Sequence, residues 1–425
     1  MNILITGATG FIGGNLGRRL AREGHQVTGA VRRPEKGRSL QPEWRWMACD
    51  FTLDHRPEDW LPRIEGMDLV INAVGIIRES GSSTFDAVQS RTPVALFEAC
   101  RQRGVRVIQI SALGAEDPGE TVRFLASKRV ADDFVRQRLP DGQVLYPSVV
   151  IGEGGDSTAL FEQLAALPVT PLTGDGLQRM RPVHVDALAE AACRLVADWP
   201  GRPGVHQVAG DRVYTVRELL ASMRLRLGLG EARFLPVPML LMRLGAVISH
   251  RLKLGALNPD TLALLQKARI PEASGVAVGL PSLEACWRNH SVSAAAAFKA
   301  GFDGLYLPLW LTLAALWLWT ALCSGVWAVD SGLALLAKAG ISPSWQPWLV
   351  YGGALLDGVL GLLMLLRWKP VRVLQVQTGV MALYLGVATV ILPSLWLDPL
   401  GCLAKTVPLL WVNGVLLAYE RARAL

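Results

Sequence analysis

The chain has 425 residues, 51% of them hydrophobic, which is longer than a single domain usually is. Charged residues recur every few positions up to about residue 300 and become sparse beyond it, which indicates a water-soluble part followed by a lipid-soluble part. The net charge of +7 comes without a lysine-rich run, an RNA-binding motif or a zinc-finger motif, so the sequence argues against nucleic acid and for a bilayer with anionic headgroups.

The six cysteines stand at positions 49, 100, 193, 286, 323 and 402, too far apart to form a metal-binding or redox pair. We therefore expect reduced thiols and no metal site. The chain begins MNILITG, without the charged and apolar regions of a secretory signal, so we expect its first domain to remain in the cytosol.

A glycine-rich turn follows the first apolar run. Residues 2–5 predict a buried strand, TGATGFIG follows at 6–13, and a helical pattern comes next. Three glycines in this position permit a tight turn, a close approach of backbone to a pyrophosphate, and close packing of helix on strand. The predicted dinucleotide-binding residues are Gly7, Thr9, Gly10, Phe11, Ile12 and Gly13. The alternative is a glycine-rich turn that holds no ligand.

The second predicted strand, 26–31, is followed by Arg32 and Arg33. Sites that select NAD(H) usually place a carboxylate there to bind the ribose hydroxyls, whereas guanidinium groups suit a 2′-phosphate. The sequence therefore favours NADP(H) over NAD(H). The alternative is that both arginines are ordinary solvated charges.

Three further strands are predicted at 46–49, 68–72 and 106–110, with helices at about 57–64, 84–103 and 121–138 between them. This alternation predicts an α/β Rossmann fold with a doubly wound parallel sheet, whose ligands bind at the carboxyl ends of the strands. Residues at those ends are Asp50, Phe51, Ala73, Val74, Gly75 and Ser111.

These motifs resemble the extended and atypical short-chain dehydrogenase/reductase family, in particular its NmrA-like branch and the nucleotide-binding accessory subunit of respiratory complex I. Further matches are YPSVVIG at 146–152, which includes Pro147, and RPVHVD at 181–186, and the resemblance covers residues 1–290. It implies that Asp50 contacts the adenine amine, that residues 73–75 line its ribose, and that the segment around Pro147 shapes the nicotinamide side of the pocket.

Enzymes of this family carry a serine and a Tyr-x-x-x-Lys motif. The resemblance implies that Ser111 positions a substrate carbonyl and that Lys128 holds the nicotinamide ribose, but Phe124 stands where the family has tyrosine. A phenyl ring has no proton to exchange, so ordinary carbonyl reduction is in doubt while cofactor binding is not. Two alternatives remain open. Ser111 or Ser127 could donate the proton in place of the tyrosine, or a quinone could be the acceptor.

His184 and the segment 239–254 each allow two interpretations. We favour a structural His184 next to a helix capped by Asp186 over a general acid. The basic, apolar segment 239–254 could lie on a membrane surface or cover the substrate pocket. A linker is expected at 291–304.

Residues 305–425 contain four long apolar segments, at about 305–329, 347–366, 373–393 and 397–419, each long enough to cross a bilayer. Basic residues between the second and third segments and at the chain's end place both in the cytosol by the positive-inside tendency. The sequence thus predicts an all-α four-helix transmembrane bundle in the inner (cytoplasmic) membrane, and with DPLG at 398–401 it resembles the DoxX-like family.

Asp357 and Lys405 fall at similar depth within the second and fourth segments, and charges inside a membrane are costly unless they are paired. We expect an ion pair between them. The alternative is that Lys405 extends to the outer interface while Asp357 is protonated or lines a polar cavity.

The resulting prediction is a membrane-anchored NAD(P)(H)-binding oxidoreductase that acts on a lipophilic substrate such as a quinone or lipid. The alternative is a non-catalytic NADP(H)-binding redox sensor or assembly factor for a membrane protein complex, which the replacement of the family tyrosine by Phe124 favours.

Overall fold

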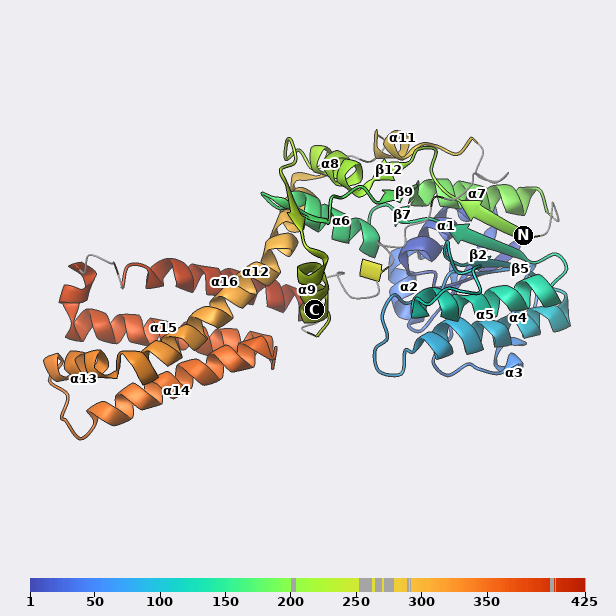
Figure 1. Cartoon of the computed structure of the whole chain (residues 1–425). Coiled ribbons are helices and arrows are strands. Elements are labelled where there is room, and N and C mark those ends of the chain that lie inside the picture. The colour runs from blue at the N-terminus through green and yellow to red at the C-terminus, as the bar shows by residue number, and fades with distance from the viewer. Residues whose placement is uncertain are drawn as a thin grey trace. The chain divides into compact units, whose positions relative to one another are not determined.

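The computed structural model describes residues 1–199, 204–251, 262–263, 270, 279–288, 290, 292–397, 401 and 403–424 (Figure 1). The chain divides into two compact units. Unit 1 comprises Met1–His250 and Gly255–Gly301, and unit 2 comprises Arg251–Leu254 and Phe302–Leu425.

Unit 1 contains a seven-stranded, wholly parallel sheet with the strand order β11-β6-β5-β4-β1-β2-β3. The strands are β1 (Asn2–Thr6), β2 (Gln26–Val31), β3 (Arg45–Ala48), β4 (Leu69–Asn72), β5 (Arg106–Ile110), β6 (Gln143–Pro147) and β11 (Gly204–Val208). This confirms the predicted Rossmann architecture. The strand order turns back at β1, so the chain segments after β1 and β4 meet at one edge of the sheet.

Helices cover both faces of this sheet (Figure 1). They are α1 (Phe11–Arg22), α2 (Pro34–Leu40), α3 (Pro57–Trp60), α4 (Thr92–Arg103), α5 (Arg123–Arg138) and α7 (Val185–Ala197), with a π-helical turn at Asp86–Arg91. Alternate strand residues point to opposite faces. Ile3 and Ile5 belong to the core under α1 and α7, whereas Leu4 belongs to the core under α4 and α5.

The rest of unit 1 is built from short strand pairs and helices. The strand pairs are β7 (Val150–Ile151) with β10 (Val183–His184), β8 (Thr170–Thr173) with β13 (Phe234–Val237), and β9 (Arg179–Met180) with β12 (Tyr214–Thr215). The helices are α6 (Asp156–Ala166), α8 (Val216–Arg226), α9 (Met239–Arg251) and α11 (Leu283–Arg288).

One sequence prediction for unit 1 needs correction, and two strands were not predicted. The helix expected at 57–64 ends at Trp60, because Pro62 lacks the amide that would continue the hydrogen-bond ladder. Strands β6 and β11 extend the predicted sheet. The residues that pair with these two strands lie far away in the sequence, so no local pattern predicted the strands.

Unit 2 is a helical bundle. It contains α12 (Ala294–Leu322) from Phe302 onward, α13 (Val329–Lys338), α14 (Gln346–Leu365), α15 (Pro370–Ile391) and α16 (Thr406–Ala424), with a π-helical turn at Cys323–Trp327 and a 3-10 turn at Pro393–Leu397. Buried side chains from α12, α14, α15 and α16 form one cluster, which includes Trp310, Met364, Leu374 and Leu416.

Three helical segments among the described residues are long and apolar enough to span a membrane: Ala294–Trp327, Gln346–Leu365 and Pro370–Ile391. Many of their apolar side chains point outward, such as Leu355, Leu362 and Val390, as expected of a lipid-facing surface. The fourth predicted span, 397–419, overlaps α16, but residues 398–400 and 402 lie outside the described residues.

The segment 291–304, predicted as a linker, is helical from Ala294 onward, where α12 begins. Alanine has the highest helix propensity, and four alanines follow Ser293 in the sequence. The Ser293 hydroxyl accepts a hydrogen bond from the Ala296 amide at 3.1 Å, which caps the first turn.

The turn between α14 and α15 is unusual. Arg367 has φ +50 and Lys369 has φ +42, and no other non-glycine residue in the described part of the chain has a positive φ. Lys369 also forms the N-terminal cap position of α15.

Candidate functional site

The glycine turn between β1 and α1 leaves no room for side chains. Gly7 has φ +68, and a Cβ atom there would lie 3.1 Å from the Ala73 carbonyl oxygen. A Cβ atom at Gly13 would lie 2.5 Å from the Gly7 carbonyl oxygen, closer than real Cβ atoms come. The Gly10 amide donates to Gly7 O at 2.8 Å, and α1 begins at the next residue. The turn thus fits a pyrophosphate at the N-terminus of α1.

The other predicted cofactor residues lie at the carboxyl ends of neighbouring strands. Arg32 and Arg33 are exposed after β2, and Gly75 is exposed after β4, where Ala73 and Val74 are half-buried. Thr9 is exposed in the glycine turn, and Phe11 and Ile12 are half-buried at the start of α1.

Asp50, Phe51 and Pro147 have more restricted surroundings. The Asp50 carboxylate already accepts hydrogen bonds from the Thr52 amide and hydroxyl, both at 2.8 Å. The Phe51 ring is buried against Trp60, with ring centroids 5.5 Å apart. Pro147 is buried at the end of β6.

The Ser111 hydroxyl binds the buried carboxylate of Asp132, which lies near Lys128 and was not predicted from the sequence. The Ser111 hydroxyl donates to Asp132 Oδ2 at 2.5 Å, and Asp132 has no exposed surface. Lys128 lies one helical turn before Asp132 on α5, and its ammonium donates to Ile110 O at 3.2 Å. The signal for Asp132 was its spacing of four residues from Lys128, which places both on one helix face.

A chain of buried hydrogen bonds connects this carboxylate to β1. Thr6 donates to Asn72 Oδ1 at 2.6 Å, and Asn72 donates to Gln109 Oε1 at 2.7 Å. Gln109 in turn donates to Asp132 Oδ1 at 3.2 Å. Since each buried polar group has its partner, the network holds the ends of β1, β4 and β5 in register with α5.

Burial sets the proton affinities of this group. It raises the pKa of Asp132 to about 6, against the hydrogen bond from Ser111 and the nearby Lys128 cation, which both favour the ionised form. Burial lowers the pKa of Lys128, and Asp132 opposes that shift. The Tyr146 hydroxyl is buried beside Asp132, and its pKa is raised by burial and by that carboxylate.

Phe124 and Ser127 flank Lys128 without offering a free proton. The Lys128 ammonium lies 5.9 Å from the centroid of the half-buried Phe124 ring. Ser127 donates to Phe124 O at 2.9 Å and accepts from Gln89 at 2.7 Å. Of the two serines considered as substitute donors, only Ser111 is coupled to a group that can exchange a proton.

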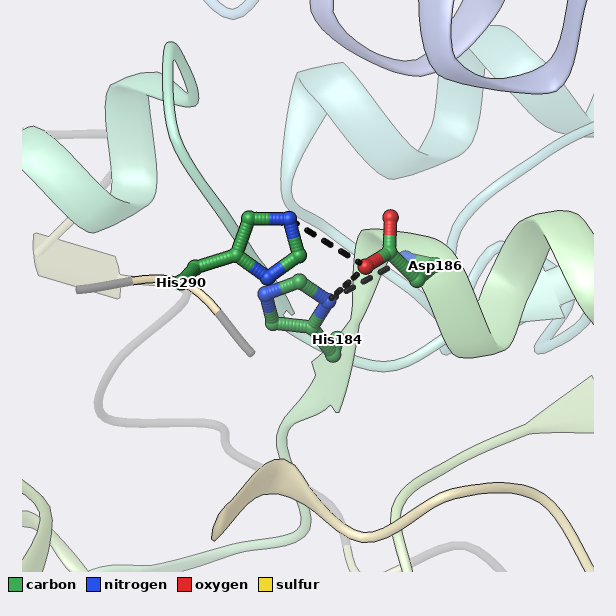
Figure 2. A group of neighbouring side chains, drawn as sticks. All are labelled: His184, Asp186 and His290. Atoms are coloured by element: carbon green, nitrogen blue, oxygen red, sulfur yellow. Dashed lines mark hydrogen bonds and ion pairs between the residues drawn. The ribbon is translucent and has the colours of Figure 1, made fainter. Parts of the chain in front are cut away.

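His184, Asp186 and His290 gather at the start of α7 (Figure 2). His184, not Asp186 as predicted, is the cap: its Nδ1 accepts from the Asp186 amide at 3.2 Å. The Asp186 carboxylate lies 3.4 Å from that nitrogen and 3.8 Å from His290 Nε2. The three possible ligand atoms lie within 4.8 Å of one another, and the His184 Nδ1 atom also accepts the capping bond.

The predicted ion pair in the bundle is wrong. Both residues are described, and no ion pair joins them: Asp357 is buried near the Tyr384 hydroxyl, at 3.5 Å, while Lys405 is exposed before α16. In unit 2 the buried Glu420 instead pairs with the half-buried Arg367, where one guanidinium nitrogen lies 2.9 and 2.8 Å from the two carboxylate oxygens.

Comparisons with known proteins agree with both halves of this description. Residues 3–205 match the NAD dependent epimerase/dehydratase family, and residues 314–413 match the DoxX-like family. Unit 1 therefore contains a nicotinamide-dinucleotide-binding domain of the short-chain dehydrogenase type, and unit 2 is a DoxX-like helical domain.

Individual relatives match unit 1 in part. A ceramide reductase of Caulobacter vibrioides is 33% identical over 198 residues, which are 46% of this chain and 60% of that protein. Mitochondrial NADH dehydrogenase (ubiquinone) 1 alpha subcomplex subunit 9 of Arabidopsis thaliana is 27% identical over 232 residues, 52% of this chain and 56% of that protein. This chain thus spans less than two thirds of either relative. UDP-glucuronic acid 4-epimerase from Bacillus cereus, solved with NAD, is 19% identical, covers 56% of this chain and 88% of its own, and has a TM-score of 0.47.

Proposed function

We propose that this protein is a membrane-anchored, NADP(H)-preferring reductase that acts on the carbonyl group of a lipophilic substrate, either a lipid or a quinone. The observation that carries the proposal is the hydrogen bond from Ser111 to the buried Asp132 beside Lys128. A purely structural carboxylate of this kind would more simply be replaced by an apolar side chain, because burying a charge is costly.

A reduced nicotinamide supplies a hydride to the carbonyl carbon, and the carbonyl oxygen must then gain a proton. Lys128 is the candidate proton donor, since burial lowers its pKa and so makes its ammonium a better acid. Ser111 orients the carbonyl when its one hydroxyl proton turns from Asp132 to the carbonyl oxygen, and Asp132 balances the charge of Lys128. This division of roles does not need the missing tyrosine.

The preference for NADP(H) rests on Arg32 and Arg33, which are exposed at the end of β2 where a 2′-phosphate would lie. The lipophilic substrate rests on the fusion to membrane-spanning helices and on the similarity to a ceramide reductase. We place the protein in the inner membrane with unit 1 in the cytosol, because Arg367 and Lys369 lie between two spans and Arg372 lies in the first turn of the second of these spans.

A second possible function is binding of the cofactor without catalysis. Phe124 in place of the family tyrosine, together with the similarity to a complex I subunit, favours a redox sensor or assembly factor that binds NADP(H) without turnover.

The test uses the full chain purified in detergent. NADPH and NADH are titrated by nicotinamide fluorescence, and the nicotinamide absorbance is then followed with a short-chain quinone or a short-chain lipid ketone. We expect tighter binding of NADPH and substrate-dependent oxidation. Tight binding with no oxidation of either substrate supports the second function, and absence of binding contradicts both.

A further inference from the structure

Helix α9 carries a row of exposed apolar side chains on unit 1. Leu240 is 75% exposed, Leu244 57% and Val247 41%, and these residues are spaced by four and three positions, so they lie along one face of the helix. Leu241, at 56%, borders the row. A contiguous apolar surface on a water-soluble unit marks a site of interaction.

The opposite face of α9 is packed. Met242 and Ala246 are buried in a small cluster with Leu262, and Val237 and Met239 pack against them. The exposed row therefore lies on the face of α9 opposite the face that packs on unit 1.

The charge around α9 has one sign. Between Ala232 and Pro259 the sequence has no aspartate or glutamate, and it contains Arg233, Arg243, His250, Arg251 and Lys253. Arg243 is exposed next to the apolar row. An apolar face bordered by basic residues is the pattern of a helix that lies in the plane of a bilayer surface and meets anionic headgroups.

We infer that α9 lies on the bilayer surface, with Leu240, Leu241, Leu244 and Val247 inserted below the headgroups and Arg243 among them. The bilayer is the occupant because the spans of the same chain keep unit 1 next to it, so a contact too weak for a free helix is formed at high effective concentration. The inference rests on the membrane spans and does not depend on the proposed reductase activity.

The test places an environment-sensitive fluorescent amino acid at Leu244 of the full chain, reconstituted in nanodiscs that contain phosphatidylglycerol and lipids with a quencher in the upper acyl chain. The matched control is the same label at Leu225 on α8, which is 62% exposed on the same unit. We expect emission from position 244 to be blue-shifted and quenched several-fold more than emission from position 225. Both labelled proteins should keep the melting temperature of the parent chain.

Two further arms separate the alternatives. Adding Arg243→Glu, or replacing phosphatidylglycerol by phosphatidylcholine, should reduce quenching at position 244. Equal quenching at the two positions overturns the inference. Blue-shifted emission at position 244 that is the same in detergent and in nanodiscs, without quenching, also overturns it, because a protein surface would then cover α9.

Discussion

Ser111 and Asp132 are joined by a hydrogen bond in a buried part of unit 1, at the carboxyl end of β5, which β4 separates from β1 and its glycine turn. The two residues come from β5's end and from the middle of α5, so the bond ties the sheet to the helix that carries Lys128. The hydrogen bond to Asp132 therefore sets the direction in which the Ser111 hydroxyl points.

Asp132→Asn tests the role of that pair in turnover. The amide keeps the shape of the side chain but removes the charge that opposes Lys128 and changes how the Ser111 hydroxyl is bound. We expect turnover to fall by roughly a hundredfold, the usual weight of a positioned proton-transfer group, with NADPH affinity unchanged. The control is Asp133→Asn, whose parent side chain is partly exposed and paired with Arg136. An equal loss in both variants would contradict the assignment.

The same carboxylate predicts a pH dependence of stability. Its pKa is about 6 in the folded protein, above the 3.8 of a free side chain, so the folded state holds more protons than the unfolded state between these values. The free energy of unfolding should therefore decrease as the pH rises from about 4 to about 6. Urea denaturation across this range, in wild type and in Asp132→Asn, isolates the contribution, and identical slopes would show that another group causes it.

Phe124→Tyr distinguishes a reductase from a sensor. The new hydroxyl would stand near Lys128, which lies 5.9 Å from the present ring centre, and would restore the arrangement of the related enzymes. If the protein is a reductase that works through Lys128, turnover should change by less than about tenfold, because the proton path already exists. Turnover that appears only in Phe124→Tyr would support the non-catalytic function of the natural chain.

Gly13→Ala tests the dinucleotide site. The added methyl carbon would lie 2.5 Å from Gly7 O, and that oxygen belongs to the backbone that joins β1 to α1. We expect loss of NADPH binding and destabilisation of about 1–3 kcal/mol. Gly245→Ala, where nothing lies within 4 Å of the new atom, is the control and should bind NADPH normally. Isothermal titration and thermal unfolding give both quantities.

Glu420→Gln tests the buried pair of the bundle. Glu420 binds Arg367 and accepts a hydrogen bond from the Tyr306 hydroxyl at 2.5 Å, so removing its charge leaves the guanidinium without compensation. Breaking one partner of a buried pair costs about 3–5 kcal/mol. Asp357→Asn should cost less, because no ion pair to Asp357 is present among the described residues. Melting in detergent compares the two, and equal losses would argue against the Arg367–Glu420 assignment.

The features that could be predicted from the sequence are those encoded by neighbours along the chain. The apolar run at 2–5, the glycines after it and the alternation of strands and helices identify the Rossmann fold, and long uncharged segments identify the spans. Features that depend on direction around a helix were missed. Asp357 and Lys405 were expected at similar depth, but Asp357 lies in the middle of α14 whereas Lys405 precedes α16. Asp132 was missed because its partner Ser111 lies 21 positions away on another element.

The turn at Arg367 and Lys369 places cationic side chains where glycine would be most stable. A left-handed conformation costs a non-glycine residue about 1–2 kcal/mol, yet both positions carry charges that we propose orient the chain across the membrane. Arg367 is also held by its pair with Glu420, so stability and topology make opposite demands at Lys369. Selection for thermal stability alone would favour Lys369→Gly. The resulting protein would have one positive charge fewer in this turn, so the orientation of the chain across the membrane would be less strongly determined.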